Sequence, residues 1–195
     1  FVGPLAEAAA RSGLLRMAGN DLEQLVSILH QPPLAEPAHS QPMTAPGSLE
    51  FEHVGFAYPS GPPVLKNLSF SAQPNTMTAI VGASGSGKTT VTRLLMRFFD
   101  ASSGCVKVGG VDVRALSSEA LMGQLSLVMQ DVYLFDDSLE ANIRVGNPDA
   151  SPRQLAQAAT LAGVDEIVAR LPQGWDTPVG EGGASLSGGE RQRVS

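Results

Sequence analysis

The chain has 195 residues, of which 43% are hydrophobic, and this size suits one substantial domain plus an appendage. Its 13 basic and 19 acidic side chains give a net charge of −6, which provides no general electrostatic reason to expect nucleic-acid binding. The lone cysteine, Cys105, excludes an internal disulfide, and no run approaches the roughly 20 apolar residues that cross a bilayer.

The chain opens with apolar residues at helical spacing, and a proline-rich segment follows them. The spacing of three or four residues predicts one stripe of a helix, made of Leu15, Ala18, Leu22, Leu25 and Leu29. Residues 31–48 contain five prolines and are typical of an extended linker, so the helix is expected to belong to a region upstream. Position 1 has neither an initiator methionine nor a signal-peptide pattern, so we expect it to lie within a longer polypeptide.

Alternating patterns after the linker predict a sheet. Residues 49–54 and 68–72 favour half-buried strands, the first with Leu49, Phe51 and His53 on one face and Glu50, Glu52 and Val54 on the other. Residues 77–81 and 125–129 are largely apolar and predict strands covered on both faces. Between them we expect a helix over 91–99 and a hairpin over 105–113 that turns at Gly109 and Gly110.

The second half of the chain is helical in character. Ser151, Pro152 and Gln154 form a capping-box pattern, with the proline at the first helical position, and Gly163 is a natural end for that helix. A short helix over 165–170 is expected to end before Pro172. Strands and helices together predict a mixed α/β fold.

A glycine-rich loop between the strand 77–81 and the helix 91–99 matches the G-x-x-x-x-G-K-[ST] pattern. Its glycines let backbone N–H groups surround a β-phosphate, Lys88 reaches the β- and γ-phosphates, and the Thr89 hydroxyl is offered to Mg²⁺. The residues expected to contact nucleotide are Gly82, Ser84, Gly85, Ser86, Gly87, Lys88, Thr89 and Thr90. A flexible glycine turn without a ligand is the weaker alternative. The loop alone leaves kinases, GTPases and other ATPases open.

A second glycine motif at the other end of the chain separates these classes. Ser187 is placed to cap a helix, while Gly188 and Gly189 expose backbone N–H groups to an anion. With Leu186 and Glu190, these residues resemble the signature sequence of ATP-binding cassette (ABC) proteins, in which glutamine is commonest at the last position. The resemblance covers nearly all of 49–195.

The resemblance implies roles that the pattern alone does not assign. Tyr58, at the end of the first strand, is implied to stack on adenine, and Gln130, after the strand 125–129, to touch Mg²⁺ or the attacking water. Ser187, Gly188, Gly189 and Glu190 are implied to bind nucleotide, and Lys88 and Gln130 to act in catalysis. Residues 134–143 and 177–181 resemble stretches of exporter-type members.

The implied fold is a P-loop NTPase core with a mixed β-sheet, an antiparallel β subdomain and a helical subdomain that carries the signature. The implied domains are the end of a transmembrane helix over 1–30, the linker over 31–48 and the nucleotide-binding domain over 49–195. The Walker B strand, with a Mg²⁺-binding Asp and the catalytic Glu, is expected after Ser195, so residues 1–195 alone are expected not to hydrolyse ATP.

The implied function is an ATPase motor that binds ATP and Mg²⁺ and pairs head to tail with a second nucleotide-binding domain, identical or related. It is expected at the cytoplasmic face of a bacterial inner membrane, beside its own upstream transmembrane domain. Soluble ABC ATPases of DNA repair or translation are the alternative, and a P-loop kinase of small molecules would require the signature to be accidental. The chain also resembles half-transporters that move iron-siderophores.

Overall fold

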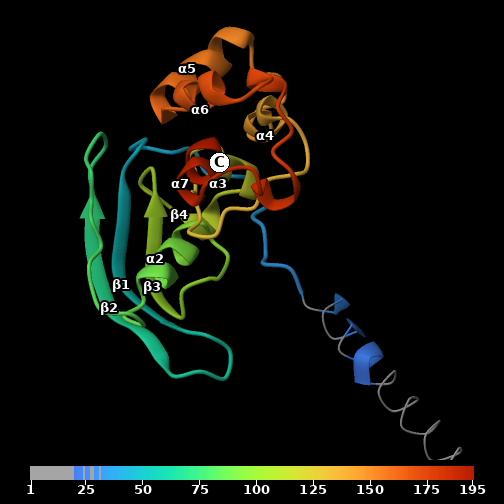
Figure 1. The fold of residues 1–195 in the computed structure, drawn as a ribbon. Helices are drawn as coiled ribbons and strands as arrows, with labels where there is room; N and C mark the ends of the chain where they lie inside the picture. The colour runs from blue at the N-terminus through green and yellow to red at the C-terminus, as the bar shows by residue number, and fades with distance from the viewer. Residues whose placement is uncertain (1–19, 24, 27–28, 31) are drawn as a thin grey trace, which may run out of the picture. The chain divides into compact units, whose positions relative to one another are not determined.

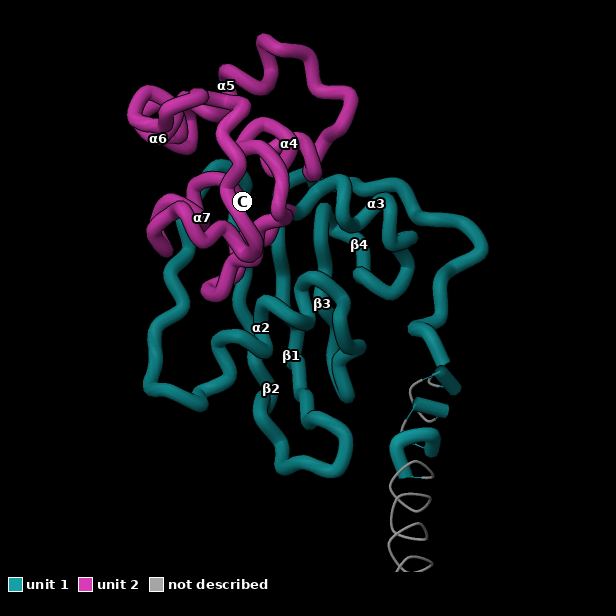
Figure 2. Tube along the Cα trace, turned by 45° about the vertical axis from the view of Figure 1, so that its right-hand side comes forward, with its two compact units in different colours: residues 1–125 teal, residues 126–195 magenta. Residues whose placement is uncertain are grey.

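The computed structural model describes residues 20–23, 25–26, 29–30 and 32–195 (Figure 1). The chain divides into two compact units, residues 1–125 and residues 126–195, which Figure 2 shows in different colours. Each unit has its own hydrophobic core, and each is described by itself.

Unit 1 is built on a four-stranded antiparallel sheet in the order β2-β1-β3-β4 (Figure 1). The strands are β1 (Leu49–Ala57), β2 (Pro63–Ala72), β3 (Ser103–Val108) and β4 (Val111–Asp112). Phe51 of β1 pairs with Phe70 of β2, and their rings stack with centroids 4.7 Å apart. Such cross-strand aromatic pairs stabilise the register of a sheet.

The face assignment of the first strand is wrong beyond Phe51. His53 has a φ of +49° and is exposed, whereas Val54 is fully buried, and the register with both neighbouring strands shifts here. A β-bulge inserts one residue, so side chains that follow it change faces. The bulge therefore places Val54 and Phe56 in the core and turns His53 outward.

The predicted hairpin is confirmed between β3 and β4. Gly109 and Gly110 form its turn with φ values of +62° and +81°, a region that glycine adopts without steric cost. After β4, a 3-10 turn, η1 (Val113–Ala115), leads to the short helix α3 (Ser118–Met122). The Ser117 hydroxyl caps α3 by accepting from the Ala120 N–H group.

The core of unit 1 lies between the sheet and the helix α2 (Lys88–Leu95). α2 contributes buried Val91 and Leu94 to it. The other buried members come from the strands and the η1–α3 region: Phe51, Val54, Phe56, Leu65, Val106, Val108, Val111, Val113, Leu116 and Leu121. α2 begins six residues after the start of the glycine-rich loop, so the packing of α2 fixes where that loop ends.

Two predicted strands are not formed in this structure. Residues 77–81 and 125–129 carry no strand hydrogen bonding, and Met77 and Val81 are 98% and 88% exposed. A buried strand requires hydrogen-bonded neighbours, and the sheet of the described residues contains neither segment. The sheet described here is thus entirely antiparallel, while the predicted antiparallel and helical subdomains are both present.

Unit 2 is helical, as predicted. Its helices are α4 (Leu139–Arg144), α5 (Pro152–Ala162), α6 (Asp165–Arg170) and α7 (Gly188–Val194), with 3-10 turns η2 (Gly174–Asp176) and η3 (Glu181–Gly183) between the last two. The capping box of α5 is confirmed, and Gly163 ends α5 with a φ of +68°. A core of Leu139, Val164, Ile167 and Val179, with neighbouring apolar residues, holds these short helices together.

The first part of the chain is described only in pieces. Leu15 and Ala18 of the predicted stripe lie outside the described residues, while Leu22, Leu25 and Leu29 are exposed. Residues 32–48 contain no helix or strand. No described helix is both long and apolar enough to cross a membrane. The domain boundaries at residues 30 and 48 stay predictions.

Candidate functional site

The glycine-rich loop lies at the start of α2 in unit 1, and residues 82–86 are exposed. The Lys88 ammonium donates to the carbonyl oxygens of Gly82, at 3.0 Å, and of Ala83, at 2.8 Å. Both acceptors are neutral groups of the loop itself. An anionic oxygen would be a stronger acceptor for the same ammonium, because charge-assisted hydrogen bonds are roughly twice as strong as neutral ones.

Two loop positions require glycine for different reasons. Gly87 has a φ of +91°, and a Cβ there would lie 2.8 Å from Cδ2 of Leu65, so the loop packs tightly on β2 at this point. Gly85 has a φ of +80°, yet a Cβ there would meet nothing within 4 Å. Gly85 therefore supplies a left-handed turn facing open space, as a phosphate cradle requires.

The two threonines after Lys88 differ in environment. Thr89 is exposed at the start of α2, where its hydroxyl is available to a ligand. Thr90 is buried, and its hydroxyl hydrogen-bonds the Tyr58 hydroxyl at 3.1 Å. Of the two hydroxyls, only that of Thr89 is free to face a ligand without breaking this internal bond.

Tyr58 directly follows β1, as predicted, but it is not a free ring at a strand end. It is half-buried, packs edge-on against Phe56 and Phe99, and accepts a hydrogen bond of 3.1 Å from the Arg93 guanidinium. The hydrogen bond with Thr90 is the main cause that lowers the pKa of Tyr58, with a further contribution from Arg93. Sequence reasoning missed Arg93, because 35 residues separate it from Tyr58 and no local pattern links them.

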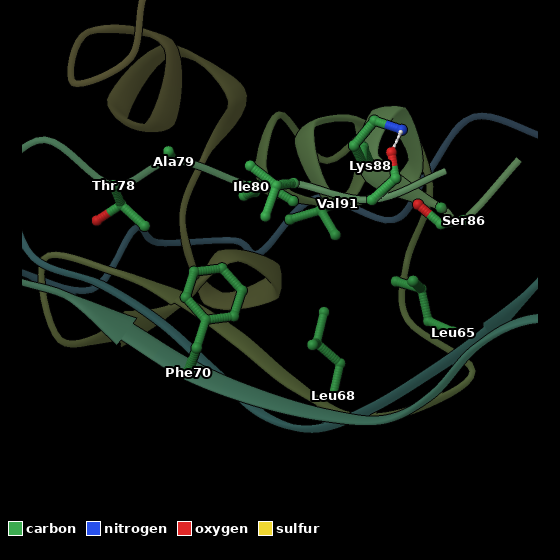
Figure 3. Close-up of a pocket in the computed structure, with 12 residues that line it drawn as sticks. Leu65, Leu68, Phe70, Thr78, Ala79, Ile80, Ser86, Lys88 and Val91 are labelled. Carbon is green, nitrogen blue, oxygen red and sulfur yellow. Dashed lines mark hydrogen bonds between the residues drawn. The ribbon is translucent and has the colours of Figure 1, made fainter. Parts of the chain in front are cut away.

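A pocket of about 480 Å³ lies beneath the loop (Figure 3). Leu65, Leu68 and Phe70 of β2 form one wall, and Ile80 and Val91 lie on the opposite side. The Lys88 side chain lies on the side of the loop away from Phe70 and Leu68 (Figure 3). The loop residues Gly82, Ser86, Gly87 and Lys88 also line this pocket, so its apolar wall from β2 adjoins the polar loop.

The second glycine motif opens α7 in unit 2. Ser187 accepts from the Glu190 N–H group, and the Glu190 carboxylate accepts from the Ser187 N–H group at 2.8 Å, which forms a capping box. The Glu190 carboxylate also pairs with Arg170 of α6. The bond from the Ser187 backbone is the main cause that lowers the pKa of Glu190, and Arg170 adds to it. Its carboxylate is thus engaged in shaping the helix start.

The two glycines of this motif are accessible to solvent. Gly188 and Gly189 are exposed, and a Cβ at Gly189 would meet nothing within 4 Å. Both belong to the first turn of α7, where N–H groups lack carbonyl partners within the helix. The start of α7 therefore presents backbone donors and the positive end of a helix dipole to solvent.

Gln130 and the two exporter-like stretches also lie in unit 2. Gln130 is exposed, and its carbonyl oxygen accepts from the Gln192 side chain of α7 at 3.4 Å. The two stretches, residues 134–143 and 177–181, pair through their backbones: the Leu139 N–H group donates to the Thr177 carbonyl, and the Val179 N–H group donates to the Asp137 carbonyl. The sequence did not predict this pairing.

The structure thus brings together two groups of predicted site residues. Tyr58 and the phosphate loop share unit 1, whereas Gln130 and the signature share unit 2. Comparison with known proteins gives the family: a model of ABC transporters matches residues 65–195, more than half of the chain. The chain belongs to the ABC transporter family.

Two relatives within the ABC family illustrate the similarity. Over 195 residues, all of this chain, it is 37% identical to the fatty acid ABC transporter ATP-binding/permease protein of Mycobacterium bovis, of which it covers 31%. Over 149 residues, 76% of this chain, it is 48% identical to the ATP-dependent lipid A-core flippase of Legionella pneumophila, of which it covers 25%. The siderophore resemblance finds no support among these relatives.

A solved structure of a bacterial Atm1-family ABC exporter with ATP bound matches with a TM-score of 0.80 and 39% identity, over 94% of this chain and 32% of that one. This match confirms the predicted fold class, a mixed α/β ABC ATPase domain with an antiparallel sheet. The chain spans about a third or less of the length of these relatives.

Proposed function

We propose that this chain is the ATP-binding motor domain of an exporter-type ABC transporter. The observation that carries the proposal is the glycine-rich loop, in which Gly85 faces open space and the acceptors that hold Lys88, among the described residues, are neutral carbonyls. On nucleotide binding, the Lys88 ammonium would exchange these carbonyls for oxygens of the β- and γ-phosphates. The exposed N–H groups at the start of α2 would complete the cradle.

The residues present fit a bound Mg²⁺, which prefers oxygen ligands and supplies neutralisation of phosphate charge. Thr89 offers an exposed hydroxyl at the start of α2, and Gln130 offers an exposed side-chain amide oxygen. We propose each of them as a ligand of the ion, as the resemblance to ABC proteins implies. Lys88 and Gln130 would serve the hydrolytic step, Lys88 by holding the transferred phosphate and Gln130 by orienting the attacking water.

The partner we propose is a second nucleotide-binding domain, either the same chain or a related one. Gly188 and Gly189 present exposed N–H groups from α7, and the space around Gly189 is open to an approaching phosphate. Each ATP would then be held between the loop of one domain and the signature of the other. Ser187 and Glu190 shape this surface by closing the helix cap.

Transport activity is proposed for the full-length protein. The Mycobacterium relative is named as a combined ATP-binding and permease protein, which supports an upstream transmembrane domain over residues 1–30 and before, joined by the linker 31–48. In the proposed arrangement, the domain 49–195 would lie at the cytoplasmic face of a membrane. No observation favours the alternative, a soluble ABC ATPase.

The test of nucleotide binding is a titration of the full-length protein with Mg·ATP. Lys88→Ala should weaken ATP binding by about 10-fold or more, because hydrogen bonds to charged groups contribute roughly 1.5–3 kcal/mol. Lys66→Ala is the matched control, since Lys66 is an exposed lysine on β2 with the same charge. Equal affinity of Lys88→Ala and Lys66→Ala would refute the assignment.

The adenine contact is tested at Tyr58. Tyr58→Ala should weaken ATP binding by roughly 1 kcal/mol, about 5-fold, because the aromatic face is lost. Tyr58→Phe keeps the ring and should retain the affinity, although it removes the hydrogen bonds to Thr90 and Arg93. Equal losses of affinity in both variants would show that stacking on the ring is not what Tyr58 contributes.

A further inference from the structure

Residues 35–48, here named the strap, are hydrogen-bonded along the surface of unit 1. The Thr44 and Ala45 N–H groups donate to the Gly109 carbonyl at 2.9 and 2.8 Å, and the Gly109 N–H group donates to the Ser48 carbonyl at 2.9 Å. Nearer the start of the strap, the Gln41 N–H group donates to the Ala115 carbonyl at 3.0 Å. A free proline-rich spacer would make no such regular bonds to one surface.

The hairpin turn between β3 and β4 is shaped to receive the strap. A Cβ at Gly109 would lie 2.7 Å from the sulfur of Met43, and a Cβ at Gly110 would lie 2.5 Å from the Thr44 hydroxyl oxygen. Met43 also packs against the core of unit 1. Strap side chains therefore fill the space over both glycines, and the positive φ values of the turn favour glycine at both positions.

Arg97 binds the other end of the strap. It follows α2 with a φ of +52°, and its side chain is only 7% exposed. Its guanidinium donates to the Asp100 carboxylate at 3.1 Å, to the Leu116 carbonyl at 3.4 Å and to the Ala35 carbonyl at 2.6 Å. A buried guanidinium has five donors to satisfy, so the Ala35 carbonyl fills a requirement of Arg97.

A carboxylate secures the same end independently of α2. Glu36 accepts from both the side chain and the N–H group of Ser118, at the start of α3. The strap is thus fixed at Ala35 and Glu36, at Gln41, and again at Thr44 and Ala45. Contacts spread over this length, to Arg97 after α2, to α3 and to the hairpin, indicate a single docked surface.

We propose that Arg97 is a positioning residue that joins the phosphate-loop helix α2 to the strap, so that nucleotide binding and strap docking are coupled. α2 begins with Lys88 and ends at Leu95, next to the Arg97 anchor, and its buried face holds Thr90, Val91 and Leu94. A helix of eight residues is a rigid rod of about 12 Å. A phosphate that draws Lys88 away from its loop carbonyls therefore acts at the first residue of this rod, and Arg97 lies two residues beyond its last residue.

The coupling rests on the proposed ATP binding, and it has a reciprocal consequence. If ATP stabilises the docked strap by some factor, the docked strap must raise ATP affinity by the same factor. The strap precedes β1 directly, so this coupling connects the nucleotide site to whatever lies before residue 35.

Amide hydrogen exchange of the full-length protein, without nucleotide and with Mg·ATP, tests the proposal. In the wild type, the amides of Gln41, Thr44 and Ala45 should exchange at least about 10-fold more slowly than in a free chain, because each is hydrogen-bonded. ATP should slow them by about a further 5-fold, the lower end of typical coupling between two sites. Lys88→Ala should abolish this second effect.

Arg97→Lys separates positioning from simple support. Lysine retains the charge beside Asp100 but lacks the fork that reaches three acceptors. Strap protection without nucleotide should be largely kept in Arg97→Lys, while the ATP-dependent slowing is lost and ATP affinity falls about 5-fold. Glu36→Gln, which leaves α2 untouched, should weaken docking and ATP affinity together. A merely structural arginine would change protection equally in both nucleotide states.

Two results would overturn the proposal: strap amides of the nucleotide-free wild type that exchange as fast as a free chain, or an ATP-bound wild type with unchanged strap protection. If the proposed ATP-binding function itself were wrong, ATP affinity would not depend on Lys88, so the two failures are distinguishable. Docking in the nucleotide-free protein is measured without reference to ATP.

Discussion

Gly189 is expected to be present for function at a small cost to the stability of α7. It lies in the first turn of this seven-residue helix with a φ that is not positive, and a Cβ there would meet no atom within 4 Å. Glycine is less favourable than alanine in a helix interior by about 1 kcal/mol, and in the first turn we expect roughly half to all of this free-energy difference. Gly189→Ala should therefore stabilise α7 by about 0.5–1 kcal/mol.

This gain is measurable as local hydrogen exchange. The Arg191 N–H group, which donates to the Ser187 carbonyl at 2.9 Å, should exchange about 2- to 5-fold more slowly in Gly189→Ala. The ATPase rate of the full-length protein should nevertheless fall about 10-fold or more. The added methyl group would occupy the space proposed for the phosphate of the ATP that the second domain's loop holds.

Gly163→Ala is the matched control, a glycine-to-alanine change that the structure predicts to be unfavourable. Gly163 has a φ of +68° at the end of α5, where alanine costs roughly 1–2 kcal/mol. The Val164 amide, bonded to the Ala159 carbonyl at 2.8 Å, should exchange faster in this variant. Faster exchange in Gly189→Ala would refute the structural reasoning, and an unchanged ATPase rate would refute the role in phosphate binding.

Three further predictions concern other groups. Burial, together with the hydrogen bond from Cys105 to Glu52, raises the pKa of the Cys105 thiol from 9.0 to about 11. Alkylation of Cys105 at pH 8 should therefore be about 100-fold slower than alkylation of a free thiol. Glu52→Gln should increase this alkylation rate. Hydrogen bonds from the side chain and the N–H group of Ser118 lower the pKa of Glu36 from 4.5. Its contribution to strap docking should thus be complete above pH 4.5 and lost as pH falls through the lower folded pKa, whereas exchange protection in Glu36→Gln should lack this step. Asn142 is buried, and its side chain hydrogen-bonds three backbone groups. Asn142→Ala should therefore lower the free energy of unfolding, measured by urea titration, by about 2–3 kcal/mol. The control Asn147→Ala, at an exposed position, should lower it by about 0.5 kcal/mol or less.

Features that depend on residues close in sequence were predictable. The capping box of Ser151 and Gln154, the end of α5 at Gly163 and the hairpin turn at Gly109 and Gly110 each involve groups only a few residues apart. The glycine-rich loop belongs to the same class, because its glycines and Lys88 lie close together in the sequence. Fold class and family followed from such local motifs, and the comparisons confirm both.

Features that depend on distant neighbours were decided by the tertiary structure. The apolar pattern of residues 77–81 predicted a buried strand, but a strand forms only where another strand accepts its hydrogen bonds, and none does so among the described residues. The bulge at His53, the bonds of Tyr58 to Thr90 and Arg93, and the docking of residues 35–48 likewise have no local signal. In each case the partner lies at least 10 residues away, so a local pattern shows which residues need partners, and only the folded chain determines which partners they meet.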